Sequence, residues 1–225
     1  MSLVASDRAT AKLLLREIFL EETYGPKLSR EDPIIIDCGA NCGFATAFFK
    51  LVHPKAQIIA IEPAPSTHRQ LQQNARENNW QQVQLIQAAC GYQRDFLDLI
   101  ESNSTSLISS SNPLRSSGAT VRVPVIEVSK LIAQFPRIDL IKLDVEGAEH
   151  DVMQDLMMTK SFVSVERLAI EYHHRMGDPS CRLGSFLQTL ENCGFTYSLV
   201  AGETSGARFT NFFQDIMIYA YKKCL

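Results

Sequence analysis

The sequence lacks any long hydrophobic run. The apolar residues Leu13, Leu14 and Leu15 are followed at once by charged residues, far short of the roughly 20 apolar residues that cross a bilayer. It also lacks an excess of charge of either sign, because 22 Lys and Arg face 25 Asp and Glu, for a net charge of -3. We therefore expect no membrane span, no signal peptide and no nucleic acid as the main partner.

Cysteine is sparse and scattered, with six residues among 225. A chain of this length with 45% hydrophobic residues buries enough surface to need no disulfides, which favours reduced thiols in the cytoplasm. Cys38 and Cys42 are four residues apart, which is not the redox C-x-x-C spacing, and no second pair completes a zinc site. We expect both to be small, packed thiols.

Short apolar runs alternate with helical patterns along the chain. Strands are expected at residues 34–36, 57–61, 83–88, 138–143 and 165–172, and helices at residues 8–22, 44–51, 66–78, 148–158 and 185–192. Strand–helix alternation predicts parallel pairing with right-handed crossovers. Residues 195–200 and 215–221 form two more strands with no helix between them, which predicts an antiparallel hairpin at one edge.

These elements predict an α/β fold with a doubly wound, Rossmann-like sheet that is mostly parallel. We expect a single domain over residues 1–225. It comprises an N-terminal helical extension (1–30), a cofactor-binding core (34–173) and a C-terminal hairpin (195–221). Residues 101–119, with eight serines, break the alternation and are expected either as a surface insertion or as a loop that closes over a ligand.

A glycine-containing turn follows the first predicted strand. It runs from Asp37 through Gly39 to Gly43, with spacing D-x-G-x-x-x-G. Dinucleotide dehydrogenases carry G-x-G-x-x-G here, but Asn41 and Phe44 occupy two of those glycine positions. A nucleotide-cofactor oxidoreductase is therefore a disfavoured alternative, and the turn suits a ligand with an amino-acid moiety and no phosphates.

Glu62 follows the second predicted strand, about 20 residues after the turn, where α/β nucleoside sites hold ribose hydroxyls. A carboxylate can accept hydrogen bonds from both hydroxyls of a diol. The alternative is a strand-end acid that caps a helix.

Three motifs resemble the FkbM family of S-adenosylmethionine-dependent methyltransferases. They are IDCGANCG at residues 36–43, IEPAP at 61–65 and, most specifically, IDLIKLDVEGAE at 138–149; IEYH at 170–173 is similar to a family strand-end motif. The resemblance implies the class I methyltransferase fold, with seven strands of which the last is antiparallel. It also implies O-methylation of a hydroxyl on a sugar, lipid or polyketide-like small molecule.

The resemblance further implies where the S-adenosyl-L-methionine cofactor binds. Asp37, Gly39 and Asn41 would face its methionine part, Glu62 its ribose, and Gln87 with Ala88 its adenine. The full expected cofactor set is Asp37, Gly39, Ala40, Asn41, Gly43, Phe44, Glu62, Pro63, Gln87, Ala88 and Asp144. The presence of Asp37, Glu62 and Asp144 argues against a non-catalytic cofactor-binding module.

Four side chains are expected at the carboxyl ends of two strands: Asp144 and Glu146 after one, Glu171 and His173 on the other. Alternation places Glu171 and His173 on the same side of their strand. Only His173 has an ordinary pKa near neutrality, about 6.5. We expect His173 to be the base or to orient the acceptor, with Asp144 close to the transferred methyl. Glu171 or Asp144 would orient the ring or act as base, and a histidine that only packs or binds substrate is the alternative.

A divalent-cation site is a further possibility at these strand ends. Its ligands would come from Asp144, Glu146, Glu149, His150 and His173. Acids at the start of a helix are also favoured by the helix dipole, so we expect no metal. Lys142, inside a buried strand, is expected to pair with a neighbouring acid.

Overall fold

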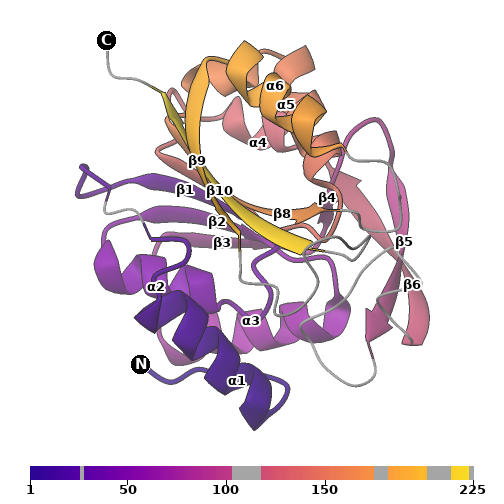
Figure 1. The fold of residues 1–225 in the computed structure, drawn as a ribbon. Helices are drawn as coiled ribbons and strands as arrows, with labels where there is room; N and C mark the ends of the chain where they lie inside the picture. The colour runs from indigo at the N-terminus through magenta and orange to yellow at the C-terminus, as the bar shows by residue number, and fades with distance from the viewer. Residues whose placement is uncertain (26–27, 103–117, 175–181, 202–213, 223–225) are drawn as a thin grey trace.

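A seven-stranded sheet with helices on both faces forms the centre of the computed structural model, which describes residues 1–25, 28–102, 118–174, 182–201 and 214–222 (Figure 1). The strand order is β3-β2-β1-β7-β8-β10-β9. The strands are β1 (Ile34–Cys38), β2 (Gln57–Ile61), β3 (Val83–Ile86), β7 (Leu140–Leu143), β8 (Arg167–His174), β9 (Phe195–Ala201) and β10 (Gln214–Lys222).

All pairings from β3 to β8 are parallel, and β10 lies antiparallel between β8 and β9. The predicted mostly parallel, doubly wound sheet with a reversed last strand is therefore confirmed. The strand order reverses between β1 and β7, and ligands of open α/β sheets bind at the carboxyl ends of strands beside such a point.

The helices divide between the two faces of the sheet. They are α1 (Arg8–Leu14) with the π-helix η1 (Leu15–Leu20), α2 (Phe44–Val52), α3 (Pro65–Glu77), α4 (Val128–Ile132), α5 (Glu149–Met158), the 3₁₀ turn η2 (Ser161–Ser164) and α6 (Leu183–Asn192). Figure 1 shows α1, α2 and α3 on one face and α4, α5 and α6 on the other. The N-terminal helix begins at Arg8 because the Asp7 carboxylate accepts from the amides of Ala9 and Thr10. Among the helices, the sequence did not predict α4 and η2.

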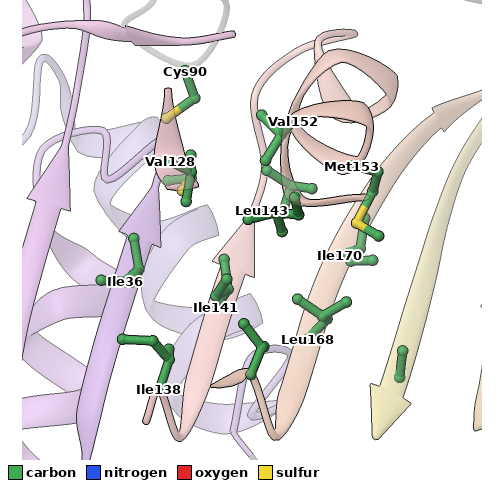
Figure 2. Close-up of a cluster of buried hydrophobic side chains, with 14 of the residues drawn as sticks. Ile36, Cys90, Val128, Ile138, Ile141, Leu143, Val152, Met153, Leu168 and Ile170 are labelled. Carbon is green, nitrogen blue, oxygen red and sulfur yellow. The ribbon is translucent and has the colours of Figure 1, made fainter. Parts of the chain in front are cut away.

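Consecutive residues of each central strand face opposite layers, which produces two cores. Ile36 and Ile141 pack with Val152 and Met153 of α5 on one face (Figure 2). The neighbouring strand residues on the other face, Ile35, Ile58 and Leu140, pack with the N-terminal helical segment and α2, which contribute Ile18, Phe44 and Phe48. Burial on both faces explains why these strands are continuous apolar runs.

A second, three-stranded sheet corrects the interpretation of the chain after β3. It contains β4 (Ala89–Cys90), β5 (Phe96–Ser102) and β6 (Gly118–Ile126), in the order β4-β6-β5. The strand expected over residues 83–88 ends at Ile86. The serine-rich segment 101–119 begins and ends in the antiparallel β5–β6 pair, so a loop was the wrong prediction for its ends. Residues 103–117 lie outside the described residues, so the ligand-closing alternative stays untested.

Among the helices that the structure describes, none combines the length and the apolar character required to span a membrane.

Candidate active site

The turn between β1 and α2 is fixed by backbone hydrogen bonds and by left-handed conformations. The amides of Gly39 and Ala40 both donate to the Ile61 carbonyl, at 2.9 Å, which joins the turn to the end of β2. The φ angles of Gly39, Asn41 and Gly43 are 79°, 52° and 91°. Glycine adopts such angles without steric cost, which explains its presence at two of these positions.

Gly39 also brings the ends of β1 and β7 into direct contact. A Cβ atom at this position would lie 1.7 Å from the backbone oxygen of Asp144. Only a residue without a side chain allows this approach. At Gly43, the N-cap of α2, a Cβ would instead meet the side chain of Leu71 at 2.6 Å.

Lys142 joins these strand ends electrostatically. Its Nζ donates to the Gly39 carbonyl at 2.6 Å and lies 3.3 Å from Oδ1 of Asp37 and 3.3 Å from Oδ2 of Asp144. Burial opposes the charge, but Asp144 and Asp37 outweigh it and raise the pKa of Lys142 above its ordinary value. The expected ion pair is confirmed, and it holds the β1 turn against the end of β7.

Asp37 lies behind the turn and is fully buried. Its Oδ2 accepts from the Thr46 hydroxyl at 2.7 Å, and its Oδ1 is the atom that faces Lys142. These contacts give Asp37 a role in supporting the turn. Its predicted direct contact with a cofactor stays a prediction.

Glu62, at the end of β2, is also nearly buried, with 6% of its surface exposed. Its Oε2 accepts from the Asn41 amide and its Oε1 from the Ala64 amide, both at 2.9 Å. Burial raises the pKa of this carboxyl to about 7, although the two amide hydrogen bonds oppose the shift. Each oxygen keeps a further lone pair that could accept from a ligand hydroxyl. The hydrogen bond to the amide of Ala64, the N-cap residue of α3, agrees in part with the alternative that Glu62 caps this helix.

A cavity of about 620 Å³ opens at the carboxyl ends of β1, β7 and β8. This volume lies within the range of small-molecule sites. Seven predicted site residues line it: Gly39, Ala40, Asn41, Phe44, Asp144, Glu171 and His173. The other expected residues lie outside the lining: Asp37, Gly43, Glu62, Pro63, Gln87 and Ala88. Among these, Gln87 is exposed just after β3, and Ala88 is buried in the core beneath α4 and α5.

Two further walls of the cavity were not predicted. The N-terminal helical segment contributes Leu13, Leu14, Glu17, Ile18, Glu21, Thr23 and Tyr24, and the β9–β10 pair contributes Val200, Asp215, Met217 and Tyr219. The cavity therefore has one end at the β1 turn and another enclosed by apolar and acidic side chains.

Tyr24 lines the cavity beside the predicted site residues, and the sequence did not indicate it. Its hydroxyl donates to Oε2 of Glu171 at 2.5 Å and lies 3.2 Å from Oδ2 of Asp144. The Lys142 Nζ lies 4.9 Å from its ring centroid, a cation–π arrangement. Burial, followed by the charges of Asp144 and Glu171, raises its pKa well above the ordinary value. No local sequence signal marks the long-range partners of Tyr24.

His173 lies among carboxylates. Its Nδ1 is 2.7 Å from Oε1 of the buried Glu149, and its Nε2 is 3.5 Å from Oε2 of Glu146 and 3.8 Å from Oδ1 of Asp144. Burial alone would lower its pKa, but the charge and hydrogen bond of Glu149 outweigh burial and raise the pKa to about 10. The ordinary pKa that favoured His173 as the base is therefore not its pKa in the folded chain, because the sequence did not reveal the buried partner. Its role as base or orienting group stays a prediction.

Glu171 and His150 complete the comparison with the sequence. Burial, followed by the charge of Asp144, raises the pKa of Glu171 to about 7. Glu171 and His173 line the same cavity, as the alternation along their strand predicted. The His150 Nε2 instead lies 3.0 Å from the Tyr172 hydroxyl, and its ring packs on Phe186, away from the cluster.

Cys38 and Cys42 are fully buried, as expected for packed thiols. Burial raises the pKa of Cys42 to about 12. A hydrogen bond with Cys90, together with burial, raises the pKa of Cys38 well above the ordinary value. Both are therefore protonated and unsuited to nucleophilic chemistry.

Comparison with known proteins identifies relatives of this chain. Residues 37–197 match the family described as "Methyltransferase FkbM domain". "Methyltransferase 1" of Beauveria bassiana is 30% identical over 162 residues, which cover 63% of this chain and 65% of that protein. "31-O-demethyl-FK506 methyltransferase FkbM" of Streptomyces tacrolimicus is 25% identical over 220 residues, covering 83% and 82%.

Among solved structures, Aeropyrum pernix fibrillarin in complex with S-adenosyl-L-methionine superposes with a TM-score of 0.53. It is 14% identical, and the match covers 92% of this chain and 73% of that one. At this identity the likeness shows the fold alone.

Proposed function

This chain belongs to the FkbM methyltransferase family, and from this premise we propose that it transfers a methyl group from S-adenosylmethionine to a hydroxyl of a small molecule. The acceptor class is a sugar, a lipid or a polyketide-like compound. Family membership, together with Asn41 and Phe44 at two dehydrogenase glycine positions, argues against the oxidoreductase alternative.

The observation that carries the proposal is the cavity at the β1 turn. It lies beside the point where the strand order reverses, and carboxylates line it. Asp144, Glu146 and Glu171 line it, and a surplus of acidic groups attracts a positively charged sulfonium ligand. The turn at Gly39, Ala40 and Asn41 has no bulky side chain between backbone and cavity, which suits an amino-acid moiety. The residues present therefore fit S-adenosylmethionine, which supplies a methyl group on a good leaving group.

Two considerations support an oxygen acceptor. The name of the Streptomyces tacrolimicus relative, which acts on 31-O-demethyl-FK506, places its methylation on an oxygen. In this chain, the wall formed by Leu13, Leu14 and Ile18 is apolar, whereas the strand ends offer carboxylates that can accept from a hydroxyl.

The catalytic roles follow from position. We assign Asp144 and Glu171 to accept hydrogen bonds from the acceptor and take up its proton, and His173 to orient it. Tyr24 and Lys142 position the carboxylates of Asp144 and Glu171 through the contacts described above. The N-terminal helical segment covers the cavity and reduces its exposure to water.

The direct test is methyl transfer from labelled S-adenosylmethionine to a panel of glycans and hydroxylated lipids. Label should appear as a methyl ether, stable to mild base, on at least one class of hydroxylated compound. Transfer only to nitrogen or to carbon acceptors would contradict the hydroxyl assignment while leaving the methyltransferase assignment in place.

Glu62→Ala should weaken binding of the demethylated cofactor about ten- to a hundred-fold, because a charged acceptor is lost from the ribose diol. The measurement is calorimetric titration of both proteins with S-adenosylhomocysteine and with an analogue that lacks the ribose hydroxyls. The parent should discriminate between the two ligands, and Glu62→Ala should not.

The analogue separates two effects, since Glu62 also accepts from the amides of Asn41 and Ala64. If Glu62→Ala still discriminates between the two ligands as strongly as the parent, Glu62 supports the turn and does not contact ribose.

A further inference from the structure

The imidazole of His173 faces three carboxylates from two segments, the turn after β7 and strand β10. Its Nε2 lies 3.5 Å from Oε2 of Glu146, 3.8 Å from Oδ1 of Asp144 and 3.9 Å from Oδ1 of Asp215. Two ligand atoms of one divalent cation, each about 2.1–2.3 Å from it, lie about 3.0–4.0 Å apart. The distances from Nε2 to the three carboxylate oxygens therefore fall in the range expected around an ion.

Glu149 orients the histidine from behind. The carboxylate of Glu149 is buried, with 1% of its surface exposed, and its Oε1 lies 2.7 Å from Nδ1 of His173. The same oxygen accepts from the Gly147 amide at 3.0 Å. A carboxylate can only accept, so Nδ1 carries the hydrogen and Nε2 is the nitrogen that points at the other three acids. A carboxylate behind a histidine is the usual outer-shell partner of a metal ligand.

The cavity also carries unbalanced negative charge, which is a separate observation. Among the described residues, its lining contains six carboxyl groups, those of Glu17, Glu21, Asp144, Glu146, Glu171 and Asp215, but only Lys142 and His173 as basic groups. The Lys142 Nζ already contacts the Gly39 carbonyl, Asp37 and Asp144. The end of the cavity around His173 therefore favours a small cation.

We propose that Asp144, Glu146 and His173 bind a divalent cation of the Mn²⁺ class, with Asp215 and Glu171 beside it. One nitrogen and several carboxylate oxygens form a donor set that such an ion accepts. The structure brings one oxygen or nitrogen of Asp144, Glu146 and His173 within 4.8 Å of one another, and does the same for Glu171, His173 and Asp215. This inference reverses the expectation from sequence that no metal is bound.

The inferred role rests on the proposed function. A cation at this position would hold the acceptor oxygen in an open coordination position and favour its deprotonated form. Ligation requires an unprotonated Nε2, so binding of the cation would release the proton that Nε2 holds in the metal-free protein. If His173 keeps this proton and stays paired with the acids, the site takes no ion.

The test is titration of the purified protein with Mn²⁺, after treatment with a chelator and removal of that chelator. Electron paramagnetic resonance measures the bound ion. The parent should bind one Mn²⁺ per chain, with nitrogen coupling from a coordinated imidazole. Glu146→Gln should weaken binding at least ten- to a hundred-fold, and Glu149→Gln, which removes only the orienting group, about ten- to a hundred-fold. Glu21→Gln is the matched control, since it removes the same charge from another wall of the cavity and should weaken Mn²⁺ binding much less than Glu146→Gln does.

Absence of nitrogen coupling in the parent would overturn the proposal without reference to any variant. Equal Mn²⁺ affinity in Glu146→Gln and Glu21→Gln would also overturn it. Circular dichroism of each variant shows that it is folded. A separate titration with S-adenosylhomocysteine in excess chelator measures cofactor binding alone. If the chain binds the cofactor there but binds no Mn²⁺ in the metal titration, the metal site is rejected and the methyltransferase assignment is kept. If the chain does not bind the cofactor, the proposed function itself is rejected.

Discussion

Gly39→Ala is expected to lower the free energy of unfolding by about 2–5 kcal/mol and to abolish cofactor binding. The left-handed backbone costs a residue with a Cβ about 1–2 kcal/mol, and the overlap with the Asp144 carbonyl adds about 1–3 kcal/mol of overpacking. The turn cannot move away easily, because the Gly39 amide is bonded to Ile61 and its carbonyl to Lys142. Urea denaturation and titration with S-adenosylhomocysteine measure the two effects.

Gly194→Ala is the matched control for this prediction. Gly194 has nearly the same conformation, with φ of 80° against 79° for Gly39, but a Cβ there would meet no atom within 4 Å. It should therefore lose only the conformational part, about 1–2 kcal/mol, and keep cofactor binding. Equal destabilisation by the two substitutions would show that the close approach of Gly39 to Asp144 does not add to the loss of unfolding free energy.

Asp144→Asn is expected to lower the rate of methyl transfer by about 10²–10⁴-fold, the usual contribution of a positioned proton-transfer group. His173→Ala is expected to lower it by about 10²-fold, the cost of a misplaced acceptor. Binding of S-adenosylhomocysteine should be largely retained, because the β1 turn and Glu62 are unchanged. The measurement is turnover with an accepted hydroxyl compound, together with a calorimetric titration of each variant.

Asp151→Asn serves as the control for charge, since Asp151 pairs with Arg94 on the surface of α5 and does not line the cavity. It should transfer methyl groups at the parental rate. Near-parental turnover in His173→Ala would remove this residue from the mechanism, and a loss of cofactor affinity equal to the loss of rate would assign Asp144 to binding.

The central sheet could be predicted from the sequence because its signal is local. Strands buried on both faces are continuous apolar runs such as residues 34–36, and each is followed by a helix with its own periodicity. The glycine turn and the acidic strand ends then fall at one edge, since parallel strands end on the same side. Asp144, Glu171 and His173 consequently line one cavity, as predicted.

The second sheet was missed although part of its signal is present. Val121, Val123 and Val125 alternate along β6, a pattern typical of a half-buried strand. Pro124 argues against a central strand, and it pairs with Phe96, the first residue of β5. The many serines of residues 101–119 favour a loop when the composition of the whole segment is considered, and they obscure the strand residues at its two ends.

The remaining differences depend on distant partners. Tyr24 contacts Glu171 and Asp144 across 147 and 120 residues of sequence, and no periodicity encodes such a contact. The ordinary pKa of His173 was a poor guide for the same reason, because Glu149 raises it from a neighbouring helix.

The most direct test of the account is hydrogen exchange of the full chain with and without saturating S-adenosylhomocysteine, with NAD⁺ in place of that ligand as the control. The account predicts slower exchange in residues 36–44 and 140–149, which surround the cavity, and no change with NAD⁺. Unchanged exchange in both segments, or protection by NAD⁺ in its place, would contradict the claim that this cavity binds the methyl donor.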